Sequence, residues 1–147
     1  MYSSVPSKLY SRHIHMDISR DRLSRPTVLV VDDDDLLRQF MARVLEDQGY
    51  CVIRAKNGRV AWEILRSIGG TVDAVVADVV MPLMDGVELA SRLAGLPIAP
   101  ALVFISAYPY HHAVADHPFL PKPFSAEQLV AILGRVVGAL EFRKVGS

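Results

Sequence analysis

Several apolar stretches of this 147-residue chain run into side chains that suit phosphate and metal chemistry. Thr27–Val31 runs into four consecutive aspartates, another stretch ends in a single aspartate, and Ala101–Ile105 runs into a serine. A lysine between two prolines follows later in the chain. Because the carboxyl ends of parallel strands meet at one edge of a sheet, we expect the residues at these ends to converge. They are Asp32, Asp33, Asp78, Ser106 and Lys122.

The chemistry that such a group could perform is phosphoryl transfer. Carboxylates held within a few ångströms repel one another unless a cation joins them, and Mg²⁺ prefers hard oxygen ligands of this kind. With the metal bound, Asp78 can stay ionised and attack a phosphoryl group to form an acyl phosphate. Phosphoryl transfer mainly requires positioning and neutralisation of the oxygens, which the metal, Lys122 and the Ser106 hydroxyl can supply.

The elements that must position these residues alternate between short apolar strands and amphipathic helices, which predicts a doubly wound α/β fold. We expect strands over Thr27–Val31, Tyr50–Ala55, Asp73–Asp78 and Ala101–Ser106. Capping residues and glycines predict helices that begin near Asp34 or Asp35, at Asn57–Gly58, at Asp85–Gly86 and, from a capping box, at Ser125 with Gln128.

Two segments carry specific expectations. The spacing in the first helix predicts a buried face made of Leu36, Leu37, Phe40, Met41, Val44 and Leu45. The segment from Ala107 to Pro121 holds three prolines and is short for a crossover, which usually contains a helix. We therefore expect a loop with at most a turn or two of helix around Tyr110–Ala115, so that the fourth helix is short or absent.

Length and composition predict one domain with a full core, flanked by a basic N-terminal arm over residues 1–26 and a C-terminal tail over 142–147. The arm is expected to be flexible, and the formal net charge of zero makes nucleic acid an unlikely partner. A lone Cys51 and the lack of an apolar stretch suited to a membrane span or a secretory signal favour a cytoplasmic protein.

The chain resembles the receiver domain of two-component response regulators over about residues 27–140, which sets the expected domain at 27–141. The resemblance rests on motifs that occur in order at the expected strand ends. They are Val-Val-Asp32-Asp33, Asp78 followed by Met81-Pro82 and Asp85-Gly86, Ile105-Ser106-Ala107, and Phe119-Leu-Pro-Lys122-Pro123-Phe124. The family implies a flavodoxin-like parallel sheet of five strands in the order 2-1-3-4-5.

The resemblance also implies a role for each matching residue. Asp78 would accept the phosphoryl group, and Ser106 and Lys122 would bind its oxygens. Mg²⁺ would be bound directly by Asp33, Asp78 and the Val80 carbonyl, and by Asp32 through a water. Phe119 takes the place of the aromatic switch residue, and the Lys122–Pro123 bond would be cis.

A member of this family would receive its phosphoryl group from a histidine kinase or a histidine phosphotransfer protein. Since little chain follows the last helix, we expect output by protein contact or phosphorelay to an unknown downstream protein. Such a chain is not an enzyme beyond its own phosphorylation and dephosphorylation.

Two alternatives stay open at this point. One is a receiver-like binding module that works without phosphorylation. The other is a phosphatase of the haloacid dehalogenase type, which also uses a strand-end aspartate, Mg²⁺, a hydroxyl and a lysine. That family needs a further acidic pair after the lysine, and only Glu127 and Glu141 follow Lys122, which disfavours the phosphatase.

Overall fold

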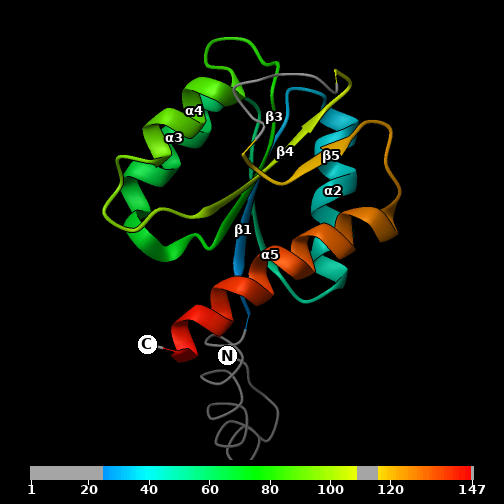
Figure 1. The fold of residues 1–147 in the computed structure, drawn as a ribbon. Coiled ribbons are helices and arrows are strands. Elements are labelled where there is room, and N and C mark those ends of the chain that lie inside the picture. Colours follow the sequence, from blue (N-terminus) through cyan, green and yellow to red (C-terminus); the bar gives the residue numbers. More distant parts are fainter. Residues whose placement is uncertain (1–24, 109–115, 147) are drawn as a thin grey trace, which may run out of the picture.

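A five-stranded parallel sheet forms the centre of the computed structural model, which describes residues 25–108 and 116–146, with the backbone alone for 141–146 (Figure 1). The strands are β1 (Thr27–Val31), β2 (Cys51–Ala55), β3 (Ala74–Asp78), β4 (Ala101–Ser106) and β5 (Phe119–Pro121). The helices are α2 (Asp35–Asp47), α3 (Gly58–Ile68) with the short 3-10 turn η1 (Gly69–Thr71), α4 (Gly86–Leu93) and α5 (Ala126–Gly146). The strand order β2-β1-β3-β4-β5 confirms the predicted doubly wound sheet.

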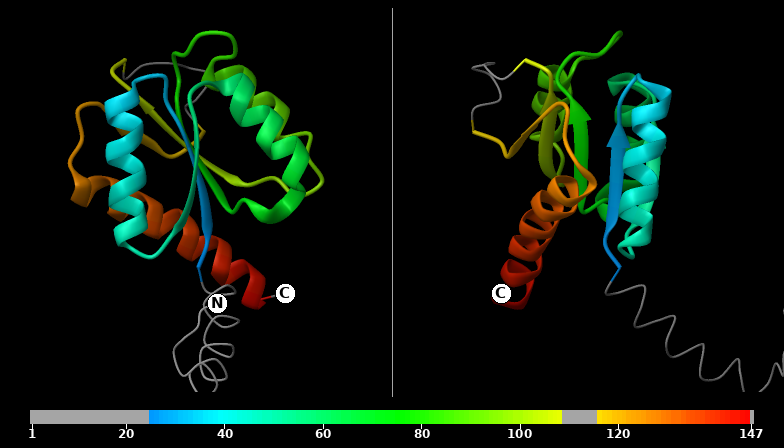
Figure 2. Two further views of the ribbon diagram at one scale, coloured as in Figure 1. Left: turned by 180° about the vertical axis from the view of Figure 1, so that it is seen from behind. Right: turned by 90° about the vertical axis from the view of Figure 1, so that its right-hand side faces the viewer.

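Helices cover both faces of this sheet, with α2 and α5 on one face and α3 and α4 on the other (Figures 1 and 2). Successive strand side chains alternate between the two faces. In β1, Val28 and Val30 pack in the cluster that contains α2 and α5 side chains, while Leu29 and Val31 pack in the cluster beneath α3 and α4. Burial on both faces explains why the strand is a continuous apolar run.

The strand register brings the carboxyl ends of the strands to a common edge. Val31 at the end of β1 pairs with Ala77, so that Asp32 and Asp78 leave neighbouring strands at the same level. Asp78 in turn pairs with Ile105, the residue before Ser106. Since β2 lies on one side of β1 in the sheet and β3 on the other, this edge is the usual location of a ligand site in such folds.

The predicted helix caps are confirmed. Asp34 caps α2, with its Oδ1 accepting hydrogen bonds from the backbone N–H groups of Leu36 (3.0 Å) and Leu37 (3.1 Å). Ser125 and Gln128 form the reciprocal capping box at the start of α5. The backbone of α5 remains helical to Gly146, beyond residue 141, where the sequence analysis set the end of the domain.

The predicted buried face of α2 is wrong at two positions. Met41 and Leu45 are buried, but Leu36 is 78% exposed and Phe40 is 41% exposed. The cap at Asp34 sets the rotation of the helix, and a single sheet face accepts only a stripe about 100° wide. Leu36 and Phe40 lie outside that stripe, each one residue before a side chain that faces the sheet.

Between β4 and β5 the described residues, 107–108 and 116–118, contain no helix. The predicted turn or two of helix around Tyr110–Ala115 lies outside the described residues, as do residues 1–24 of the predicted arm over 1–26. Among the helices that the structure describes, none combines the length and the apolarity that crossing a bilayer requires.

Close backbone packing at Gly86 gives a first prediction. A Cβ atom there would lie 2.7 Å from the carbonyl oxygen of Asp78 and 2.9 Å from the Phe104 ring. We expect Gly86→Ala to lower the free energy of unfolding in urea by about 1–3 kcal/mol, as overpacking does. Gly134→Ala is the matched control, because a Cβ there meets no atom within 4 Å and alanine favours the helix. Equal effects of the two substitutions would contradict the packing argument.

Candidate functional site

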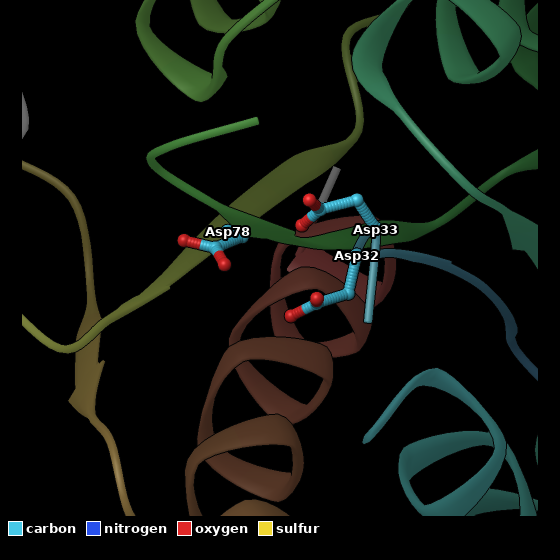
Figure 3. A group of neighbouring side chains, drawn as sticks. All are labelled: Asp32, Asp33 and Asp78. Atoms are coloured by element: carbon cyan, nitrogen blue, oxygen red, sulfur yellow. The ribbon is translucent and has the colours of Figure 1, made fainter. Parts of the chain in front are cut away.

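Three aspartates gather at the carboxyl edge of the sheet (Figure 3). Asp32 and Asp33 follow β1, and Asp78 ends β3. One carboxylate oxygen from each residue lies within 4.8 Å of the other two. Asp32 is fully buried and Asp78 nearly so, whereas Asp33 is exposed, so the cluster opens to solvent beside Asp33.

Lys122 supplies a positive charge to two of these carboxylates. Its Nζ donates a hydrogen bond of 2.6 Å to Oδ2 of Asp78 and lies 3.2 Å from Oδ2 of Asp32. The backbone N–H of Lys122 donates to the carbonyl of Ser106 at 2.8 Å, which fixes the end of β5 beside the end of β4. The Lys122–Pro123 bond is cis, as expected.

The remaining carboxylate oxygens are only partly satisfied. Oδ1 of Asp32 accepts from the N–H of Asp34 at 2.8 Å, and Oδ1 of Asp78 accepts from the N–H of Val80 at 3.1 Å. Oδ2 of Asp32 is buried and accepts no hydrogen bond from another described residue, so its contact with Lys122 is an ion pair. Three carboxylates against one ammonium leave a formal charge of −2. This hard-oxygen set with an unsatisfied buried oxygen fits a divalent cation such as Mg²⁺.

Burial and neighbouring charges shift the pKa values of Asp32 and Lys122. Burial raises the pKa of Asp32, and the nearby charge of Asp78 adds to this, although the Asp34 N–H and Lys122 oppose it. For Lys122, burial is the largest effect and lowers the pKa. The hydrogen bond that Lys122 donates to Asp78 and the charges of both aspartates together outweigh it, so the pKa of Lys122 is raised and the ammonium form is favoured.

Ser106 is buried at the end of β4, and its Oγ accepts a 2.9 Å hydrogen bond from the N–H of Tyr108. Phe119 begins β5, where it is partly buried against the cluster beneath α3 and α4. Val80 is exposed two residues after Asp78. The structure therefore groups Asp32, Asp33, Asp78 and Lys122, and places Ser106 at the end of the neighbouring strand.

Arg38 is a residue at this edge that the sequence analysis missed. Its guanidinium donates to the carbonyl of Asp32 at 2.8 Å and pairs with Asp35 at 2.6 Å, and its side chain is only 16% exposed. The arginine thus fastens the first turn of α2 to the loop that carries Asp32 and Asp33. The spacing of three residues between Asp35 and Arg38 was the available signal, because such pairs meet on a helix.

Comparison with known proteins places these observations in a family. Residues 28–134 match the response regulator receiver domain family. The chain is 42% identical over 109 residues to the sensor kinase CckA of Brucella abortus, covering 70% of this chain and 12% of that protein. It is 34% identical over 109 residues to the response regulator receiver protein CpdR of the same organism, covering 70% of this chain and 89% of CpdR.

The response regulator MprA of Mycolicibacterium vanbaalenii is 38% identical over 110 residues, which are 71% of this chain and 47% of MprA. The chain thus spans less than half the length of MprA and a small part of CckA.

Solved structures agree with the sequence relatives. The receiver domain of the hybrid histidine kinase CckA superposes with a TM-score of 0.68 at 32% identity, covering 76% of this chain and 98% of that structure. The Vibrio cholerae chemotaxis protein CheY4 gives a TM-score of 0.67 at 31% identity, with the same coverage of each chain. With the family match, the strand order and the aspartate cluster in agreement, this chain belongs to the response regulator receiver domain family.

Proposed function

We propose that this chain works as a response regulator receiver that accepts a phosphoryl group on Asp78 from a phosphohistidine protein. The observation that carries the proposal is the carboxylate of Asp78, which lies 2.6 Å from the Lys122 ammonium and within 4.8 Å of the Asp32 and Asp33 carboxylates. A nucleophilic carboxylate, a cation contact and a metal-binding acidic pair are together what acyl phosphate formation needs.

Mg²⁺ is the proposed cofactor, with Asp33, Asp78 and the Val80 carbonyl as direct ligands and Asp32 as a ligand through a water. When bound, the metal would neutralise charge on the phosphoryl oxygens and on the clustered carboxylates. Without such a cation, the formal charge of −2 at this edge would oppose the approach of an anionic donor.

The chain's own residues divide the transfer step between them. A carboxylate oxygen of Asp78 attacks the phosphorus, the P–N bond to the donor imidazole breaks, and the nitrogen keeps the electron pair. Lys122 exchanges its contact with Asp78 for one with a phosphoryl oxygen. Because Oγ of Ser106 accepts from Tyr108, the hydroxyl hydrogen is available to donate to another phosphoryl oxygen.

Phe119 would respond to that new bond of Ser106, since it begins the strand adjacent to β4 and is only partly buried. The partners of this proposal are a histidine kinase or a histidine phosphotransfer protein in the cytoplasm, and a downstream protein that recognises the phosphorylated form. Output would run through protein contact or through phosphorelay to a further histidine.

Incubation with acetyl phosphate and Mg²⁺, followed by intact mass spectrometry, tests the proposal. We expect one added phosphoryl group, which disappears in Asp78→Asn and when EDTA removes the metal. Asp34→Asn is the matched control, because asparagine also caps helices and Asp34 lies outside the aspartate cluster. Turnover of a phosphomonoester would instead indicate a phosphatase, and an unmodified wild-type chain would indicate a binding module that works without phosphorylation.

Removing the buried charge at Asp32 should stabilise the metal-free protein. We expect Asp32→Asn to raise the free energy of unfolding at neutral pH by about 1 kcal/mol, because the carboxylate is buried beside Asp78. The pKa of Asp32 is raised, so its contribution to stability is full below the ordinary aspartate pKa and is lost as the pH rises through its folded value. In urea unfolding at successively lower pH, the difference in free energy of unfolding between the two proteins should therefore shrink. A less stable variant at neutral pH would refute this.

The residues flanking the site predict a long-lived phosphoryl group. Val80 and Tyr108 lie two positions after Asp78 and Ser106 and are 56% and 67% exposed. One is apolar and the other bulky, so neither is suited to orienting a hydrolytic water. We expect Val80→Asn to shorten the lifetime, measured by intact mass after removal of the donor, and Ile98→Asn at a remote exposed position to leave it unchanged. Decay of the wild-type phosphoprotein within seconds would rule the prediction out.

A further inference from the structure

A hollow of about 360 Å³ lies between α3 and α4, on the face of the sheet that these helices cover. Trp62 of α3 and Met84, from the loop after β3, are among its lining residues, and arginines from both helices surround them. None of these residues belongs to the aspartate cluster. The family comparison and the proposed phosphoryl transfer leave this surface without a role.

An exposed leucine stands at the edge of this hollow in an unusual backbone conformation. Leu83 is 72% exposed and has φ of 71°, the left-handed region that favours glycine. Such strained residues are found at active sites, ligand clamps and switch regions. The adjoining backbone packs closely, since a Cβ atom on Gly58 would clash with the carbonyl oxygen of Met84. The side chain of Leu83 is therefore exposed to solvent, while the backbone next to it is held in place by close packing.

The charges around the hollow are unequally paired. Arg92 pairs with Glu88 at 2.9 Å and lies 5.7 Å from the centre of the Trp62 ring. Arg59 and Arg66 are exposed and form no ion pair with another described residue. The lining residues thus carry three guanidinium groups and two carboxylates, those of Glu63 and Glu88, so that their net formal charge is +1.

Arg59 and Arg66 are also spaced in a way that suits one ligand. They are seven positions apart in the sequence, which places them on the same side of α3, about 10 Å apart along the helix. Carboxylates four residues apart in an extended segment point to the same face and lie about 13 Å apart, which the long arginine side chains can match, and the side chain midway between them points to that face as well. An apolar side chain between those carboxylates would then meet Trp62 and Leu83, and tryptophan and arginine are the residues that contribute most at protein interfaces.

We propose that this hollow is a docking surface for an acidic segment of a partner protein, with an apolar side chain flanked by carboxylates. The carboxylates meet Arg59 and Arg66, and the apolar side chain packs on Trp62 and Leu83. This role goes beyond the proposed function and does not require phosphoryl transfer at Asp78.

Trp62 provides the measurement, because it is the single tryptophan of the chain. The probe is the peptide acetyl-Gly-Glu-Ser-Leu-Ser-Glu-Gly-amide, titrated into the full chain while tryptophan fluorescence is recorded. A peptide with lysine in place of both glutamates is the charge control. We expect a saturable change with the acidic peptide alone, and a weaker affinity at high salt.

Two variants separate docking from folding. The double variant Arg59→Glu, Arg66→Glu should weaken the affinity about tenfold or more, and Arg43→Glu on α2 should not change it. Leu83→Gly should weaken the affinity roughly tenfold yet leave the stability unchanged or higher, because glycine adopts this φ without strain. No saturation by about 1 mM peptide, an equal response to the lysine peptide, or full affinity in both hollow variants would overturn the proposal.

Discussion

Placing a carboxylate in the interior, next to a second one, is the constraint on which this site depends. Asp32 has no exposed surface and Asp78 very little, so each carboxylate needs a cation or a hydrogen-bond donor to remain ionised. The ammonium of Lys122 contacts both and is itself favoured in the charged form. Lys122 directly follows β5, the edge strand beyond β4. The ionisation of the carboxylates at the ends of β1 and β3 therefore depends on a residue from the edge of the sheet.

The parallel sheet provides the rigidity that this arrangement requires. Asp78 belongs to β3, a strand buried along its whole length, and the next residue is still held by a 3.0 Å hydrogen bond from the N–H of Val79 to the carbonyl of Ile105. The bond from the Lys122 N–H to the Ser106 carbonyl does the same for the β4–β5 edge. Side chains on loops are positioned well only when the backbone at the loop ends is fixed, and here each end is a strand hydrogen bond.

The sequence predicted those parts that depend on local patterns. The strand ends, the caps at Asp34 and Ser125 and the convergence of Asp32, Asp33, Asp78 and Lys122 all follow from short-range spacing and parallel topology. The exposure of Leu36 and Phe40 could not be predicted this way, because the rotation of α2 is set by its cap and by packing on the sheet. The contact of Arg38 with the Asp32 carbonyl is likewise tertiary, since it depends on how the helix leaves the strand.

One short loop joins the aspartate cluster to the hollow beside Trp62. It begins at Asp78, carries Leu83 and Met84 into the hollow, and ends at the Asp85 cap of α4. Its backbone is held by bonds from the Gly86 N–H to the Val79 carbonyl (2.8 Å) and from Met84 to Pro82 (2.7 Å). Two ligands that contact one loop affect each other's affinity only when the loop has two arrangements that they distinguish. A loop held this firmly favours one arrangement, which argues that docking at the hollow and chemistry at Asp78 are independent.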